Sequence, residues 1–268
     1  VFFFVFRNDT KYAKSLDNKY ENEDIVFEEH KYDDYLFQTG LFATQFPIKQ
    51  APVKNRQVFY ELEDDIVAVS DNFTGTVWNT GVMRHGKYYS IETAANFDGN
   101  PITLGEILQD ETEVPDKYFL TDKAKLEKFQ YLRGPKKLER TSADGHTYIY
   151  SEGGMSPYDD LNLPGRTMLT SEGTVNRSTH FLFVNNKYRL LTPIEAERLQ
   201  DFPDDWTAYK KLEDGTVVEV SDKMRMFFMG NALVTEIVRK TAAPIFEIDS
   251  QIGAAVLNVG DSFIHSAS

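Results

Sequence analysis

The chain has 268 residues, of which 41% are hydrophobic, 26% charged and 13% aromatic. These values are typical of a globular protein with a substantial core, and they disfavour a disordered, collagen-like or membrane-bundle protein. The sequence contains no cysteine, which excludes disulfide bonds, thiolate metal sites and a cysteine nucleophile within this chain. The histidines are scattered without ligand spacing, so no metal site is expected.

The formal net charge is −13, and a uniformly acidic surface would repel nucleic acid. Basic residues are nevertheless concentrated between Lys117 and Arg140, where eight lysines and arginines face three acidic residues and the net charge is +5. Because salt screens charges beyond about 8–10 Å, such a local patch can still bind a polyanion. On charge alone, a solvated helix face is the favoured interpretation.

The first half of the sequence predicts a strand, a polar region and a small sheet. Val1–Phe6 is apolar at every position, which is typical of a strand buried on both faces in a parallel sheet. Residues 11–35 predict loop with a short helix. Residues 37–92 alternate β-rich runs with polar turns, which predicts hairpins of a small twisted sheet. These runs are Val58–Tyr60, Ile66–Val69, Thr76–Trp78 and Tyr88–Ile91.

Helix-capping signals organise the middle of the chain. Thr103 with Glu106 forms a capping-box pattern and predicts a short helix over 103–108. Thr121-Asp122 opens a helix that runs to about Tyr131 and ends at Gly134-Pro135. Residues 145–184 are punctuated by glycine, which lets backbone approach a ligand closely, and contain β-type fragments at Thr147–Tyr150 and Thr167–Thr170.

The last third predicts two helices. Thr192-Pro193 with Glu195 combines a cap, a proline at the first helical position and a capping box, so a helix is expected over Pro193–Gln200. Lys223–Lys240 is expected to form one final helix, followed by a flexible tail over about 246–268. No apolar run reaches the length of about 20 residues that a membrane span needs.

Three segments resemble motifs of the DNA cytosine-5 methyltransferases. Residues 189–206, RLLTPIEAERLQDFPDDW, resemble the ninth motif, and residues 229–234, MGNALV, resemble the tenth at a family-like spacing of about 25 residues. Residues 1–9 resemble the strand that closes the eighth motif. The family places its variable target-recognition domain between the eighth and ninth motifs, so the resemblance covers the chain to about residue 240.

The resemblance implies an α/β fold, namely part of a Rossmann-like S-adenosylmethionine-dependent methyltransferase domain plus a small strand-rich target-recognition domain. Residues 1–9 would close the catalytic sheet, residues 10–185 would form the recognition domain, residues 186–245 would return to the catalytic domain and residues 246–268 would be the tail. The implied partners are double-stranded DNA and a missing N-terminal catalytic half or large subunit, in the cytoplasm of a bacterium or as a phage protein.

The resemblance also implies two sets of residues that do no chemistry themselves. Gly230, Asn231 and Ala232 would contribute to the S-adenosylmethionine pocket, and because Ala232 replaces the usual serine, a contact there must use backbone. The ninth motif would brace the recognition domain against the catalytic domain, and a local pair between Glu195 and Arg198 is possible. The structural residues of that motif are Arg189, Thr192, Pro193, Glu195, Arg198, Phe202 and Pro203.

A glycine-bounded segment, Gly165–Gly173, occupies the place of the family's recognition loop. Arg166 could make a bidentate contact with guanine, and the other polar residues could reach base edges or phosphates. For any single residue of this loop, a position in a solvent-facing turn is an equally good interpretation. Taken together, the residues of the loop favour contact with DNA. The predicted DNA-binding residues are Arg166, Thr167, Thr170, Ser171, Asn176, Arg177, Ser178, Lys136, Lys137 and Arg140.

Members of this family flip cytosine out of the duplex, add a cysteine thiolate to C6, and transfer methyl from S-adenosylmethionine to C5. Without cysteine this chain cannot methylate alone. It opens on Val1 without an initiator methionine, so we expect a fragment of a longer methyltransferase of the restriction-modification type. The small subunit of a split enzyme and a catalytically inactive DNA-binding module are the alternatives. A glycosidase is disfavoured because adjacent carboxylates such as Asp159-Asp160 are expected to be solvated.

Overall fold

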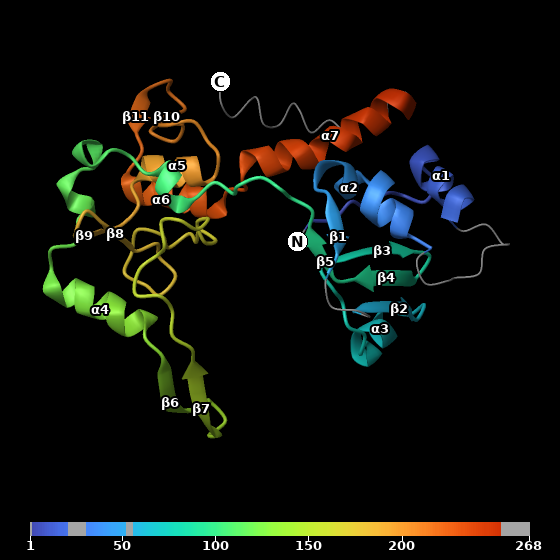
Figure 1. Cartoon of the computed structure of the whole chain (residues 1–268), viewed down its shortest axis with the longest axis horizontal. Coiled ribbons are helices and arrows are strands. Elements are labelled where there is room, and N and C mark those ends of the chain that lie inside the picture. Colours follow the sequence, from blue (N-terminus) through green and yellow to red (C-terminus); the bar gives the residue numbers. More distant parts are fainter. Residues whose placement is uncertain (1, 21–30, 52–55, 253–268) are drawn as a thin grey trace. The chain divides into compact units, whose positions relative to one another are not determined.

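The computed structural model describes residues 2–20, 31–51 and 56–252 (Figure 1). The chain divides into two compact units, one formed by Val1–Gly99 with Arg239–Ser268 and the other by Asn100–Val238. The division at residues 9, 185 and 245 that the resemblance implies stays a prediction.

The first unit is built around an antiparallel three-stranded sheet in the order β2-β4-β3, with a separate β1-β5 pair. Its core consists largely of aromatic side chains, including the fully buried Tyr89 of β4. The runs Val58–Tyr60 and Tyr88–Ile91 are therefore confirmed as strands of a small sheet, but the hairpin is formed by β3 and β4, and β2 joins β4 from farther along the chain. The elements are α1 (Lys11–Tyr20), η1 (Tyr35–Thr39), α2 (Leu41–Gln45), β1 (Ile48–Gln50), β2 (Gln57–Glu61), α3 (Ile66–Asn72), β3 (Thr80–Arg84), β4 (Lys87–Ile91) and β5 (Thr93–Ala95).

Two runs that were expected to be strands are not strands. Ile66–Val69 lies in helix α3, because the Asp65 side chain accepts a hydrogen bond from the Val67 N–H and caps a helix there. Thr76–Trp78 has no strand partner, and the Trp78 N–H donates instead to the Ser90 hydroxyl at 2.7 Å. In both places a nearby polar side chain satisfies the backbone group that a sheet would otherwise have bonded.

The prediction of a buried strand at Val1–Phe6 is wrong for the described residues 2–6, while Val1 lies outside them. These residues form no strand, and the side chains of Phe3 and Val5 are 79% and 87% exposed. The rings of Phe4 and Phe6 instead contact Phe42 and Tyr12, with centroids 4.4 and 4.8 Å apart. The described part of the chain offers these residues no neighbouring strand, and a strand forms only where a neighbour supplies its ladder of hydrogen bonds.

The second unit contains short helices and three antiparallel two-stranded sheets around an apolar core. Leu104, Met168, Leu182, Leu191 and Met226 form the centre of that core, and Phe129 stacks on Phe181 in a second cluster. The elements are η2 (Leu104–Ile107), η3 (Glu111–Glu113), η4 (Asp116–Tyr118), α4 (Lys123–Arg133), β6 (Lys136–Thr141), β7 (Thr147–Glu152), β8 (Leu182–Val184), β9 (Lys187–Arg189), α5 (Pro193–Leu199), β10 (Tyr209–Lys211), β11 (Val217–Glu219) and α6 (Asp222–Asn231). Helix α7 (Thr235–Ile252) begins in this unit, and its residues from Arg239 onward belong to the first unit.

The capping signals of this unit are confirmed. Thr103 and Glu106 form the capping box of η2, although that helix is a 3-10 turn. Asp122 caps α4 by accepting from the Ala124 N–H. Thr192 and Glu195 form the capping box of α5, with Pro193 in its first turn.

Three other expectations fail in the second half of the chain. Residues 167–170 are irregular and lead into a turn rather than forming a strand. The single helix expected over Lys223–Lys240 is two helices, α6 and α7, separated at residues 232–234. The Gln200 amide donates to the Met229 carbonyl at the end of α6, and the Asp201 carboxylate accepts from the Glu236 N–H at the start of α7. Residues 246–252, expected in the tail, continue α7, and residues 253–268 lie outside the described residues.

The architecture is thus mixed α and β, and every strand pairing among the described residues is antiparallel. A parallel Rossmann-like sheet is not among those pairings. In the same part of the chain, no helix combines the length and the apolar character needed to cross a bilayer.

Candidate nucleic-acid interface

The segment Gly165–Ser178, here called the recognition segment, lies directly on helices α5 and α6. A Cβ added at Gly165 would stand 2.5 Å from Leu199 Cδ1 of α5, so the segment approaches that side chain closely here. At the other end, Gly173 has φ +82° and faces Met226 of α6. Between them Met168 is buried in the core. The segment is irregular but is anchored along its length.

A buried carboxylate, Asp159, holds the first part of the recognition segment. Its Oδ1 accepts from Arg166 Nε at 2.5 Å, and its Oδ2 accepts from Arg133 Nη2 and from the Phe181 N–H, each at 2.7 Å. Arg133 and Arg166 also both donate to the Thr179 carbonyl. Burial acts to raise the pKa of Asp159, but the hydrogen bonds from Arg166 and Arg133 outweigh it and hold that pKa below its usual range.

Asp159 is therefore not the solvated turn residue that its neighbour Asp160 suggested. Its partners come from 7, 22 and 26 positions away along the chain, and no local pattern marks them. The same contacts define Arg166, which is half-buried and uses Nε and Nη2 inside the protein. The guanidinium nitrogen outside these bonds is Nη1.

A second buried pair, Glu172 with His180, closes the recognition segment. Glu172 accepts from the His180 N–H at 2.7 Å and lies 3.2 Å from His180 Nδ1. His180 Nε2 accepts from the Arg166 N–H at 3.1 Å, which leaves Nδ1 as the ring nitrogen that donates to Glu172. This histidine was expected to have no special role, and its position between two parts of the segment is set by tertiary packing alone.

The second half of the segment is cross-linked by short polar contacts. Asn176 Oδ1 accepts from the Ser178 and Thr179 N–H groups, and its amide donates to the Ser171 carbonyl. Arg177 donates to the Leu132, Gly134 and Gly153 carbonyls, which ties the segment to the base of the β6–β7 hairpin. Among the predicted DNA contacts of this segment, Thr167, Thr170 and Ser171 are exposed, while Asn176, Arg177 and Ser178 are half-buried.

The β6–β7 hairpin extends away from α4 and from the rest of the unit (Figure 1). Lys137 and Arg140 are exposed on it, and the Arg140 guanidinium stacks 3.9 Å from the Tyr150 ring centroid. Lys136 is half-buried, with Nζ bonded to the Leu132 carbonyl and to Glu152 at 2.8 Å. A two-stranded hairpin exposed on both faces is only marginally stable in water, so a bound partner would stabilise it.

The ninth-motif residues surround a buried ion pair. Arg189 Nη1 and Nη2 donate to Glu195 Oε2 and Oε1 at 2.8 and 2.7 Å, and both side chains are almost fully buried. Glu195 also accepts from the Gln109 and Thr192 N–H groups at 2.9 Å. Pro193 is buried in the first turn of α5. The motif therefore holds α5 against the η2 region of the same unit.

The possible local pair between Glu195 and Arg198 does not form. Because Glu195 turns inward to Arg189, Arg198 pairs with Asp204 instead, through Nε at 2.8 Å and Nη2 at 2.7 Å. Arg198 also donates to the Ile107 and Leu108 carbonyls. Phe202 packs against the core, and the carbonyl of the exposed Pro203 accepts from the Trp206 N–H at the following turn.

The tenth-motif residues lie at the end of α6. A Cβ added at Gly230 would stand 2.5 Å from the Leu169 carbonyl oxygen, and still closer to the carbonyl carbon of that residue and to Thr170 N. The exposed Asn231 donates its amide to the Phe227 carbonyl at 2.9 Å, and Ala232 is half-buried against the core. The space in front of Gly230 is thus filled by the recognition segment.

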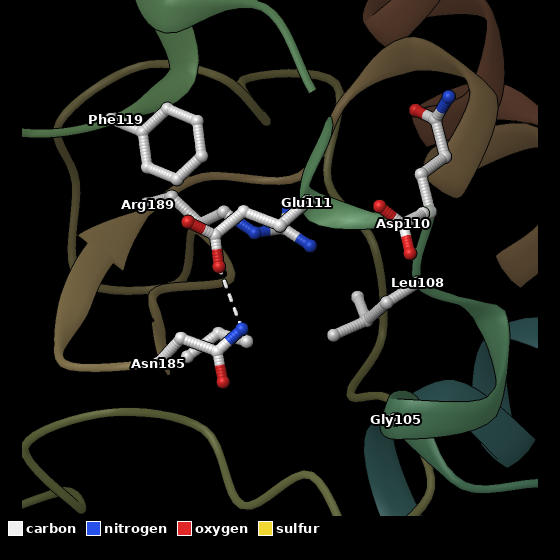
Figure 2. A pocket seen from close by; sticks show the side chains of 9 residues that line it. Gly105, Leu108, Asp110, Glu111, Phe119, Asn185 and Arg189 are labelled. Carbon is white, nitrogen blue, oxygen red and sulfur yellow. Dashed lines mark hydrogen bonds between the residues drawn. The ribbon is translucent and has the colours of Figure 1, made fainter. Parts of the chain in front are cut away.

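A cavity of about 350 Å³ lies beside the ninth motif (Figure 2). Asn185 donates to Glu111 there at 2.6 Å, and Lys187 also pairs with Glu111. Arg189 lines the cavity but is paired with Glu195. The charged groups of Glu111 and Arg189 at this cavity are therefore engaged within the protein. Across the described ranges, no cluster of three or more histidine, aspartate or glutamate side chains could hold a metal ion.

The chain is similar in sequence to known DNA methylases. The model of the C-5 cytosine-specific DNA methylase family matches residues 1–247. A curated relative, the type II methyltransferase M.Sau3AI of Staphylococcus aureus, is 45% identical over 250 residues. The alignment covers 93% of this chain and 55% of the relative, so the chain spans about half the length of the curated relative that it matches.

Proposed function

The chain belongs to the C-5 cytosine-specific DNA methylase family, and on that premise we propose that it forms the C-terminal, DNA-recognising part of a longer DNA cytosine-5 methyltransferase of a restriction-modification system. The observation that carries the proposal is the seating of the recognition segment on α5 and α6, the helices of the ninth and tenth motifs. The rest of the enzyme supplies the Rossmann-like sheet and the cysteine that this chain lacks.

Duplex DNA meets the exposed polar side chains of the recognition segment and of the β6–β7 hairpin. Lys137 and Arg140 contact phosphates, while Thr167, Thr170 and Ser171 lie within reach of base edges or sugar. Hydrogen bonds within the protein fix the shape of this surface, and the residues that make them are the half-buried Lys136, Asn176, Arg177 and Ser178. The hairpin is then stabilised by the DNA it contacts.

Arg166 is the best-positioned candidate for sequence readout. Because Asp159 and the Thr179 carbonyl hold its Nε and Nη2, the side chain keeps one orientation, and Nη1 is the nitrogen that reaches a base. A pre-oriented donor loses less entropy on binding than a mobile side chain. A bidentate contact with guanine would require Nη2 to leave Asp159 and Thr179.

Cytosine C5 is shielded in the stacked duplex, so the target base must be flipped out before it reacts. This chain holds the duplex during that step, and the thiolate that attacks the ring lies outside it. S-adenosylmethionine supplies the methyl group when it is bound. Of the residues predicted to hold it, Gly230 does not fit, because Leu169 and Thr170 fill the space in front of it. The exposed Asn231 and the backbone of Ala232 are the groups suited to the cofactor.

The test is methyl transfer by the full-length protein that contains this chain. We expect plasmid DNA incubated with that protein and radiolabelled S-adenosylmethionine to gain label, and bisulfite sequencing to place 5-methylcytosine in one short sequence context. This chain alone should transfer no methyl group. Label transfer by this chain alone would refute the proposal that the nucleophile lies elsewhere. Specific DNA binding without methylation by the full-length protein would favour an inactive DNA-binding module.

The DNA surface is tested separately with two lysines on hairpins of the same unit. Lys137→Ala should weaken binding equally on target and random duplexes. It should also make the negative slope of log K against log salt concentration less steep by roughly one unit. Lys211 of β10 is also exposed and serves as the matched control, for which we expect no change. An unchanged slope for Lys137→Ala would remove the hairpin from the DNA interface.

A further inference from the structure

Helix α6 contacts the recognition segment at its tightest point, Gly230. The Leu169–Thr170 peptide packs so closely on Gly230 that a Cβ there would overlap the backbone of both residues. Real Cβ atoms essentially never come within 3.0 Å of such atoms, and backbone cannot swing aside as a flexible side chain can. Glycine at this position is therefore a requirement of packing between two segments of the chain, more than 50 residues apart.

The peptide that Gly230 contacts is a defined structural unit. The Leu169 carbonyl accepts from the Glu172 N–H at 2.9 Å, which closes a turn around Thr170 and Ser171. Glu172 in turn bonds the backbone and ring of His180. A shift of the Leu169 carbonyl would therefore move the two exposed hydroxyl side chains and strain a buried pair together.

The same helix also supports the end of the segment. Gly173 adopts φ +82°, a conformation that favours glycine. Its open side faces Met226, because a Cβ added at Gly173 would stand 3.6 Å from Met226 Cγ, an ordinary van der Waals distance. Met226 is buried in the same core as Met168, which lies just before the turn. The recognition segment thus takes its conformation from two points on α6, one turn apart.

We infer that Gly230 is a positioning residue for DNA recognition rather than part of a cofactor cradle. It lets the turn at Thr170–Ser171 seat on α6, and so fixes where the exposed hydroxyl groups face the DNA. This inference rests on the proposed function, since it concerns the same DNA surface. The glycine of the tenth motif is then explained by packing within this chain, against the Leu169–Thr170 peptide.

The experiment uses the full-length protein and the substitution Gly230→Ala, with Gly154→Ala as the matched control. A Cβ added at Gly154 would stand 3.4 Å from Pro135 Cδ, an ordinary van der Waals distance, so the same chemical change is accommodated there. Binding of the target duplex, of a random duplex and of S-adenosylhomocysteine is measured by titration. Hydrogen exchange is followed in peptides covering residues 165–180 and 136–152.

We expect Gly230→Ala to weaken target-duplex binding roughly tenfold or more, the value of one well-placed base contact. Affinity for S-adenosylhomocysteine should stay within about twofold, and exchange should rise in 165–180 but not in 136–152. Weaker cofactor binding with unchanged DNA binding would overturn the inference, as would unchanged exchange in 165–180. Gly154→Ala should behave as the wild type.

A second variant covers the case in which Gly230→Ala does not fold. Gly173→Ala strains the other point of attachment to α6, because alanine disfavours φ +82°, while its added Cβ meets Met226 only at van der Waals distance. The same pattern of weaker target binding and unchanged cofactor binding is expected. Unchanged target binding by Gly173→Ala would also overturn the inference. If the wild-type protein binds no DNA, the proposed function itself fails, and the two failures are therefore distinct.

Discussion

Replacing Glu195 by alanine should be the most damaging single change in the ninth motif. Both side chains of the Arg189–Glu195 pair are nearly inaccessible, with 3% and 0% exposure. The substitution removes the carboxylate and leaves the Arg189 guanidinium buried without its counter-ion. A buried charge left alone is far less favourable than the pair, because neither water nor an opposite charge compensates it.

The magnitude follows from the bonds that Glu195 makes. Removing one partner of a buried pair costs about 3–5 kcal/mol. Glu195 additionally accepts from the Gln109 and Thr192 N–H groups, the second bond being half of the capping box, so the change leaves two backbone donors without a partner. Each such loss adds about 1 kcal/mol or more. We therefore expect a total near the upper end of this range, about 5 kcal/mol.

The assay is equilibrium urea unfolding, with Glu127→Ala as the control. Glu127 also lies on a helix and pairs with a basic side chain, but its partner Lys123 is 3.8 Å away and both are largely exposed. An exposed pair of this kind contributes about 0.3–0.5 kcal/mol. Glu195→Gln should fall between the two variants, because it keeps the side-chain volume and one acceptor. A cost below about 1 kcal/mol for Glu195→Ala would refute the reasoning.

Three further predictions concern the recognition segment and the core beneath it. Asp159→Asn should destabilise the protein at pH 7. The folded-state pKa of Asp159 lies below its usual 3.8, so the wild type loses the stabilisation from the ionised carboxylate as the pH falls below 3.8. The difference in unfolding free energy between wild type and variant should therefore shrink in acid, as urea unfolding at several pH values would show. Arg166→Ala should cost about 1–3 kcal/mol on the target duplex and little on a random one, as titrations would show; equal losses on both would identify a phosphate contact. Phe129→Ala should lower the unfolding free energy by about 3–5 kcal/mol, because Phe129 is buried and stacks on Phe181. Tyr131 is exposed on the same helix, and Tyr131→Ala should change that free energy by less than about 0.5 kcal/mol. Similar costs for the two variants would contradict the importance of the buried stack.

Local patterns in the sequence predicted an element correctly wherever its hydrogen-bond partners lie within a few residues of each other. The caps at Thr103, Asp122 and Thr192 each bond a group two or three positions away, so residue types alone predict them. The strand fragment Thr147–Tyr150 is a run of β-formers after a glycine, and it lies in β7. The family was likewise readable from the long ninth motif, whose match does not depend on the fold.

Tertiary structure decided which side chains these elements bring together. Asp159 reads as a solvated turn residue, yet Arg133 and Arg166 approach it from different segments and bury it. Apolar composition at residues 2–6 could not indicate a strand reliably, because a strand exists only when a neighbouring strand supplies its hydrogen bonds. The close packing of Gly230 on the Leu169–Thr170 peptide joins positions that are about 60 residues apart. Periodicity and propensity act over one or two turns, whereas such contacts depend on how the whole chain packs.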